Sequence, residues 1–215
     1  EMTFLEAINE VLARLREPSV TTIASSTYST LIGKFVNDAK RQVEDAWDWN
    51  CLSATLTLTT TPGTSLYTLT GSGRRPKGIA VNDTTNKIRL MNAPLQWITD
   101  QQQLTTVQSA PAVYYAWNGT DGTDNKVELF PTPNGTATIK FNMYIPQAPL
   151  TTESDILTVP YEAVVAGAYA RAIVERGEDG GLASSEAYGL FKSILADQIA
   201  LESNNFIEYE TWNAV

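Results

Sequence analysis

The sequence predicts an α+β fold in which helices from both ends of the chain form one bundle and an antiparallel β lobe is inserted between them. Two changes of periodicity predict this order. Apolar residues recur at helical spacing near both ends of the chain, whereas the middle alternates apolar and polar residues, as half-buried strands do. We therefore expect bundle helices in residues 1–50 and 151–205, a β-rich lobe in 51–150 and a separate terminal segment in 206–215.

Two helices are expected before residue 50. In the first, over residues 3–15, Thr3 and Glu6 have the spacing of a capping box, and Glu17-Pro18 ends the helix because the residue before a proline is disfavoured in helical geometry. The second follows a Ser/Thr-rich linker, and its charged residues, Lys40 and Glu44 among them, fall largely outside its apolar stripe. That stripe consists of Tyr28, Leu31, Ile32, Phe35, Ala39, Val43, Ala46 and Trp47.

Strands and turns are expected to fill the lobe. Leu52–Thr59 alternates, Thr61-Pro62-Gly63-Thr64 is typical of a turn, and we expect Leu66–Leu69 to return as the hairpin partner of the first strand. Residues 94–103 are expected to form a short helix across the sheet. Further strands are expected between turns rich in Gly, Asn and Asp, at residues 78–81, 87–91, 112–117, 126–130 and 137–144.

Helical spacing returns after Pro149. Pro160 is tolerated in the first turn of the next helix, and Gly177 is expected to end it. Residues 163–174 are rich in small side chains, so we expect another helix to approach closely. A final helix is expected over residues 183–202, with one apolar side formed by Tyr188, Phe191, Ile194, Leu195 and Ile199.

The composition argues against most enzyme classes. The chain has no histidine and one cysteine, which removes Ser-His-Asp and Cys-His catalysis and nearly all zinc sites. Neighbouring carboxylates at Glu175, Glu178 and Asp179 do not meet the separation that a glycosidase needs across a sugar ring. We therefore predict no enzymatic activity, no catalytic or metal-binding residues and no cofactor.

The charge is unevenly distributed along the chain. The net charge is −9 overall, with −3 in residues 1–50, +2 in 51–150 and −8 in 151–215. Because nucleic-acid binding relies on Lys and Arg neutralising phosphates, this balance argues against a classical DNA-binding module, although it suits a wall past which DNA slides. No apolar run approaches the roughly 20 residues of a membrane-spanning helix, so no membrane partner is expected.

Three local features could carry contacts. The basic cluster of Arg74, Arg75 and Lys77 is either a contact surface of the lobe or a solvated loop. Asp121–Asn125 offers oxygen ligands, but it lacks the spacing and the closing Glu of an EF-hand loop, which favours a plain hairpin tip. The terminal segment carries aromatic side chains that usually need a surface to bury against, either a partner or its own bundle. Its candidate contact residues are Phe206, Ile207, Tyr209 and Trp212.

Three stretches resemble a known family. Leu5–Val20, which contains Glu17-Pro18, resembles the opening of podovirus tail tubular protein A, a family of head-to-tail adaptors, and Ala46-Trp-Asp-Trp49 is similar to the place where a Trp closes the second helix of that family. Val159–Ala170, followed by Arg176–Asp179, resembles phage adaptors more broadly. The specific motifs touch about a quarter of the chain, and the β lobe matches by kind rather than by residue.

The resemblance implies a virion structural protein of a short-tailed bacteriophage, assembled in the host cytoplasm. It implies a homo-oligomeric ring, dodecameric in that family, between the portal and the tail nozzle and around the path of DNA ejection, without specific DNA binding. The bundle would build the ring, the terminal segment would contact the portal, and the lobe would contact the nozzle, with tail fibres as a further candidate partner. Glu162, Glu175 and Asp179 would line the channel, the alternative being that they only maintain solubility.

Two other functions also fit the sequence. A tail component that binds or degrades host carbohydrate would use Trp97, Tyr115 and Trp117 as stacking platforms on the lobe. A neck-completion or tail-terminator protein of another phage type would differ in ring number. A glycan-binding or cleavage assay separates the first alternative from an adaptor, and images of the ring separate the second.

Overall fold

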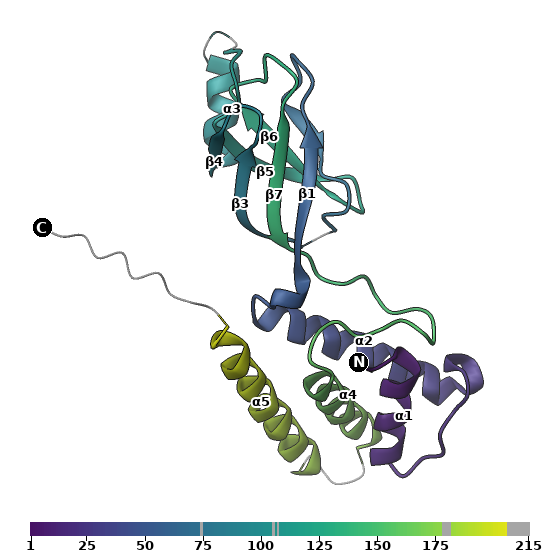
Figure 1. Ribbon diagram of the computed structural model, residues 1–215. Helices are drawn as coiled ribbons and strands as arrows, with labels where there is room; N and C mark the ends of the chain where they lie inside the picture. Colours follow the sequence, from purple (N-terminus) through teal and green to yellow (C-terminus); the bar gives the residue numbers. More distant parts are fainter. Residues whose placement is uncertain (74, 105, 107, 178–181, 206–215) are drawn as a thin grey trace, which may run out of the picture. The chain divides into compact units, whose positions relative to one another are not determined.

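The computed structural model describes residues 1–73, 75–104, 106, 108–177 and 182–205 (Figure 1). The chain divides into two compact units. The helical unit contains residues 1–51 and 147–215, and the β unit contains residues 52–146. Five α-helices and one sheet rich in antiparallel pairs make up the described residues, so the predicted α+β class is confirmed.

The helical unit holds four of the α-helices: α1 (Phe4–Arg14), α2 (Thr27–Ala46), α4 (Tyr161–Arg176) and α5 (Leu182–Ser203). Short 3₁₀ turns lie at η1 (Ile23–Ser25) and η2 (Asn50–Leu52). The β unit holds α3 (Leu95–Leu104) and the strands β1 (Ser53–Thr59), β2 (Leu66–Thr68), β3 (Lys77–Asp83), β4 (Ile88–Asn92), β5 (Tyr114–Thr120), β6 (Asn125–Phe130) and β7 (Thr138–Tyr144).

Helix α4 contacts each of the other three helices of its unit. Its small side chains permit this: a Cβ placed on Gly167 would lie 3.0 Å from Phe191 Cε2 of α5 and 3.1 Å from Ala39 Cβ of α2. Eight residues of α4 are buried, all of them Ala, Val or Gly. The prediction that another helix approaches this segment closely is confirmed.

The helix ends follow local sequence signals. At the start of α1, Thr3 N donates to Glu6 Oε2 at 2.7 Å and Glu6 N donates to Thr3 Oγ1 at 3.3 Å, which is the predicted capping box. Gly177 ends α4 with a φ of 63°, in the left-handed region where glycine is favoured, and its N–H donates to Ile173 O at 3.1 Å.

A polar strip on α2 binds the chain where it re-enters the helical unit. Lys40 Nζ donates to Glu44 Oε1 at 2.9 Å and to Gln147 O at 2.7 Å, and Gln147 N donates to Glu44 Oε1 at 3.1 Å. One turn earlier, Asn37 exchanges two hydrogen bonds with the backbone of Leu150. Lys40 and Glu44 are buried, so their expected place on the outer side of the helix is wrong.

The β unit is a curled seven-stranded sheet in the order β1-β7-β3-β4-β5-β6-β2. Its strand pairs are antiparallel except for β4 and β5, which run parallel. The expectation of a wholly antiparallel lobe is therefore wrong at this pair. The connection between the two strands contains α3, and a crossover of this kind is what parallel neighbours need.

The expected hairpin between the first two strands is also wrong. β1 pairs with β7 and β2 pairs with β6, so the two strands lie at opposite ends of the strand order. The loop between them binds the segment before β7 instead: Thr60 N donates to Ala137 O and Gly63 N donates to Pro133 O, both at 2.9 Å. This loop is therefore fixed by a segment about 70 residues away along the chain rather than by its own flanks.

The β unit has a core of its own between its strands. More buried and less buried side chains alternate along β1 and β7, as expected for strands with one solvated face. The main cluster consists of Leu58, Leu69, Val81, Leu90, Ala112, Tyr115, Val127, Leu129, Ile139, Phe141 and Met143.

Candidate interaction surfaces

Some of the predicted contact residues lie outside the described residues. They comprise the whole expected portal contact, one channel residue and one residue of the basic cluster: Phe206, Ile207, Tyr209, Trp212, Asp179 and Arg74.

The other two candidate channel residues lie at opposite ends of α4. Glu162 is in its first turn and Glu175 in its last, and both are exposed. At 1.5 Å of rise per residue, their backbones are separated by roughly 20 Å along the helix. The charge of Glu162 raises the pKa of its neighbour Tyr161. The structure does not bring the two carboxylates together into one cluster, so a channel role remains a prediction.

The two described residues of the basic cluster lie just before β3 and at its first position. Arg75 is exposed in a bend, and Lys77 is half-buried at the first position of the strand. The loop before them is held by Asp124, whose Oδ1 accepts from Gly71 N at 3.1 Å and from Gly73 N at 3.0 Å.

The oxygen-rich loop after β5 is a hairpin tip. Asp121 Oδ1 accepts hydrogen bonds from Thr123 N at 2.9 Å and Asp124 N at 2.8 Å, which lowers the pKa of Asp121. The backbone thus uses the oxygens that a calcium ion would need. The interpretation as a plain hairpin tip fits this geometry.

A row of side chains crosses four strands on the face of the sheet opposite the core. Lys140 of β7 pairs with Thr57 of β1 and with Asn82 of β3, and Asn82 pairs with Arg89 of β4. Directly paired residues of antiparallel strands share a face. Lys140, Arg89 and Thr57 are exposed, whereas the alternate position Val81 is buried.

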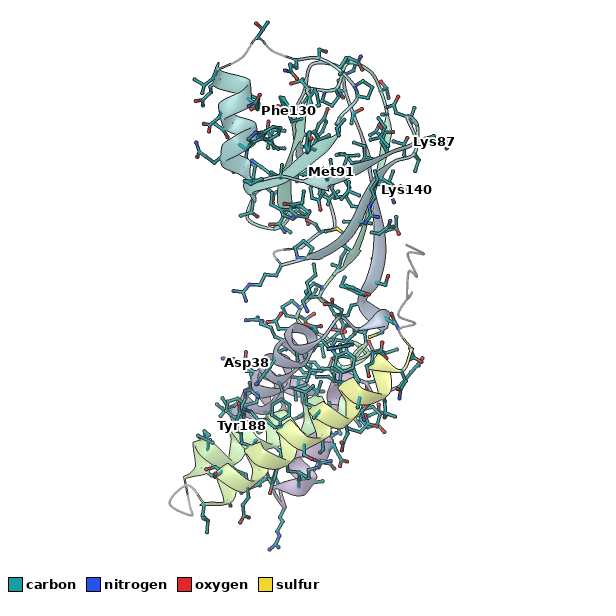
Figure 2. All side chains as sticks on the ribbon, turned by 90° about the vertical axis from the view of Figure 1, so that its left-hand side faces the viewer. Asp38, Lys87, Met91, Phe130, Lys140 and Tyr188 are labelled. Atoms are coloured by element: carbon teal, nitrogen blue, oxygen red, sulfur yellow. The ribbon has the colours of Figure 1, made fainter. Side chains whose placement is uncertain are left out.

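A third cation stands in the turn beside this row. Lys87 has a φ of 59°, a left-handed conformation that costs a non-glycine residue about 1 kcal/mol. Asp83 shapes the turn by accepting from Thr85 N and Asn86 N, both at 2.9 Å. Figure 2 shows Lys87 and Lys140 on the same side of the β unit. We call Lys87, Arg89 and Lys140, with Thr57 and Asn82, the basic sheet face.

Helix α5 has an outward side with large apolar residues. Only Phe191 is fully buried in this helix, whereas Leu182, Leu190 and Leu201 are exposed to 72%, 57% and 63%. Exposed leucines that recur along one helix mark an interaction surface more often than single exposed ones do.

One of the three residues predicted as a carbohydrate platform is not available for stacking. Tyr115 is buried in the core, edge-on to Phe141 with ring centroids 6.1 Å apart. Trp117 packs against the same core, and Trp97 lies edge-on to Tyr114 at 5.1 Å. A sugar ring needs an exposed aromatic face, which Tyr115 does not offer, so its predicted role is wrong.

A buried carboxylate in the β unit is satisfied by neutral donors. Glu128 accepts from Ser65 Oγ at 2.6 Å, from Gln102 Nε2 at 2.9 Å and from Asn118 Nδ2 at 3.0 Å. These bonds join the loop before β2, helix α3 and strand β5 to strand β6. Glu128 therefore has a structural role: its buried carboxylate is fully hydrogen-bonded and links these elements.

Among the residues that the structure describes, no group of three or more Cys, Asp and Glu side chains could hold a metal ion. None of the described helices combines the length and the apolar character that crossing a membrane requires.

Residues 2–208 match the family model described as SU10 adaptor protein. The chain belongs to this family. Membership makes it a phage structural adaptor, which implies a non-enzymatic role, a place in the virion and contacts with other head and tail components. The comparison with curated proteins gave no match.

Sequence reasoning on this SU10 adaptor family member missed the basic sheet face. Alternation along each strand indicates that Arg89 and Lys140 point away from the core. Their adjacency depends on β3, which lies between β4 and β7 in the sheet. Strand order of this kind cannot be read from a single sequence.

Proposed function

We propose that the protein is the head-to-tail adaptor of a short-tailed phage, forming a ring between the portal and the tail nozzle and around the path of DNA ejection. The match of residues 2–208 to the SU10 adaptor family carries the proposal. The resemblance of Leu5–Val20 to tail tubular protein A supports the short-tailed type and a dodecameric ring. Assembly takes place in the host cytoplasm.

The helices of the two chain ends form a bundle that builds the ring, and the outward side of α5 supplies a lateral contact. Leu190 and Leu201 are spaced by three turns on this side and are more than half exposed. Burying an exposed leucine side chain stabilises an interface by roughly 1.5–3 kcal/mol. A ring repeats this contact once per subunit.

The remaining parts make the axial contacts. Residues 206–215, with Phe206, Tyr209 and Trp212, reach the portal, since aromatic side chains are favoured anchors in interfaces. The β unit contacts the nozzle through Arg75, just before β3, and Lys77, its first residue. Tail fibres are a further partner. Glu162 and Glu175 face the channel and keep passing DNA from adhering.

The test is to mix purified protein with portal rings and to measure co-sedimentation and negative-stain images. The full chain is expected to form rings on the portal. A truncation lacking residues 206–215 is expected to keep the circular dichroism spectrum of the full chain and to lose portal binding. Co-sedimentation of this truncation at full-length levels would remove the terminal segment from the mechanism.

A second arm separates lateral from axial contacts. Leu190→Ser/Leu201→Ser changes two exposed positions of α5, so the fold is expected to persist while closed rings are lost. Val174→Ser is the matched control, because Val174 is 64% exposed on α4 and lies outside the α5 surface. Closed rings of the double variant would contradict the lateral role of α5.

A further inference from the structure

The basic sheet face carries three cations, and no described paired position on this face of the sheet holds a carboxylate. Arg89, Lys140 and Lys87 are exposed. The other positions on the same face of β1, β3, β4 and β7 hold no Asp or Glu: they are Ser, Thr, Asn, Ala, Met, Tyr and one further Lys. The described registers therefore place no carboxylate on this face. The carboxylate of Asp83, in the turn that contains Lys87, is buried and bonded to the turn backbone.

The complementary charge is carried by the same chain. Residues 1–51 and 147–215, which make up the helical unit, have a net charge of −11, whereas residues 52–146 have a net charge of +2. Exposed carboxylates stand on all four helices of the unit, for example Asp38 on α2, Glu175 on α4 and Asp197 on α5. The helical unit thus carries negative charge in excess, opposite in sign to the three cations of the basic sheet face.

We infer that the basic sheet face docks onto the acidic helical unit of a second copy of this chain. The inference rests on the proposed ring, because subunits related by rotation about a ring axis touch through two different patches, one on each side. Opposite charges on those two patches favour head-to-tail contact and disfavour like-to-like contact.

The backbone at Lys87 supports a role for its charge. Glycine adopts a φ of 59° without strain, so the turn between β3 and β4 does not itself require a lysine. Asp83 already fixes the turn through Thr85 N and Asn86 N. What lysine adds over glycine at this position is a cation beside Arg89.

Double-stranded DNA is the less suitable occupant of this face. Duplex binding draws on the neutralisation of many phosphates at once. The β unit has a net charge of only +2, and the whole chain has −9, so the field that attracts DNA is weak. A protein surface with a few matched carboxylates needs no more than the three cations present.

The experiment measures self-association of the full chain by sedimentation velocity over a concentration series, at low and high salt, alone and on portal rings. Arg89→Ser/Lys140→Ser is expected to weaken association about tenfold at low salt, as the loss of two exposed ion pairs predicts. Wild-type association is expected to weaken with salt. Lys87→Gly is expected to weaken association while the melting temperature stays the same or rises.

The matched control is Lys34→Ser/Arg41→Ser, which removes the same charge from two exposed positions of α2. It is expected to leave association unchanged or to strengthen it. Equal association of all variants would overturn the docking surface and leave the ring proposal standing. A wild-type chain that stays monomeric both alone and on portal rings would overturn both.

Binding of DNA, the other candidate occupant, is tested with a short labelled duplex of random sequence, whose fluorescence anisotropy is measured as protein is added. Wild-type protein is expected not to bind it at the salt concentration where subunits associate. Duplex binding that Arg89→Ser/Lys140→Ser abolishes would assign the face to DNA and overturn the inference.

Discussion

Lys40 and Glu44 hold the chain where it returns to the helical unit. Their side chains are about 2% exposed, and each also bonds to the backbone of Gln147. A buried ion pair adds little net stability compared with apolar residues of the same size, but removing one partner leaves a buried charge unpaired. The pair is therefore sensitive to single substitutions.

Glu44→Ala is expected to lower the free energy of unfolding by about 3–5 kcal/mol, because Lys40 then keeps its buried charge without an opposite charge beside it. Lys40→Met/Glu44→Leu is expected to cost much less, since both charges are removed and the volume is retained. Urea unfolding followed by circular dichroism checks both. A double variant as unstable as Glu44→Ala would show that the bonds to Gln147, rather than the unpaired charge, determine the loss.

Stability should also depend on pH through Glu44. Burial raises the pKa of Glu44 above its ordinary value of 4.5, so between these two values the folded protein holds a proton that the unfolded chain has released. The contribution of this group is fully present below pH 4.5 and is lost as the pH rises through the folded-state value. Unfolding curves over this range are expected to show that slope in wild type and not in Lys40→Met/Glu44→Leu.

Single side chains were predictable where their partners are close in sequence. The capping box of Thr3 and Glu6 spans one helical turn and follows from the sequence alone. The burial of Lys40 depends on Gln147, which is 107 positions away. Spacing on the helix gave no sign of that partner, which explains why both charged residues were expected at the surface.

Helix α4 is the central element of the helical unit. It contacts α1, α2 and α5. At Gly167, the atoms nearest to an added Cβ belong to Phe191 of α5 and Ala39 of α2. Close-packed interiors resist even one added methyl group. The tolerance of α4 for larger residues should therefore be low at this position.

Gly167→Ala is expected to lower the free energy of unfolding by about 1–3 kcal/mol, because the new methyl group would press on Phe191 and Ala39. The same substitution at Gly189 of α5 is the control. No atom lies within 4 Å of a Cβ there, so alanine is expected to stabilise the helix by about 0.5–1 kcal/mol. Thermal unfolding of both variants checks the opposite signs, and stabilisation by Gly167→Ala would contradict the packing described for α4.

Elements were easier to predict than their pairing. The final helix was expected over residues 183–202 and spans Leu182–Ser203, because its apolar period is local information. β1 and β2 were expected to pair because they are neighbours in sequence, yet β7 and β6 take those places. Pairing is a competition between all strands, and the sequence of one segment does not contain its outcome.

Charge separates the chain into two regions of different sign. The helical unit is strongly acidic and the β unit is slightly basic. Net charge by segment was readable from the sequence, but the basic sheet face was not, since Arg89 and Lys140 are 51 positions apart and meet only through the intervening β3. Short motifs such as Glu17-Pro18, in contrast, indicated a phage adaptor, and the match of residues 2–208 to the SU10 adaptor family agrees with that class.

The β unit is expected to fold without the rest of the chain. It contains its own core, and its first and last strands pair along seven positions from Ser53–Tyr144 to Thr59–Thr138. Residues 52–146 expressed alone should give a β-rich circular dichroism spectrum and one cooperative thermal transition. The counterpart, in which a short Gly/Ser linker replaces the segment, should retain a helical spectrum. An unfolded 52–146 fragment would contradict independent folding.

The two ends of the β unit lie side by side. Ser53 is opposite Tyr144, and Ile145 N donates to Leu52 O at 2.9 Å. The gene segment that encodes this unit can be replaced by recombination at its two ends, because any domain with adjacent termini can be inserted at the same position. Sequence variation can then accumulate in this unit while the helices stay under separate selection.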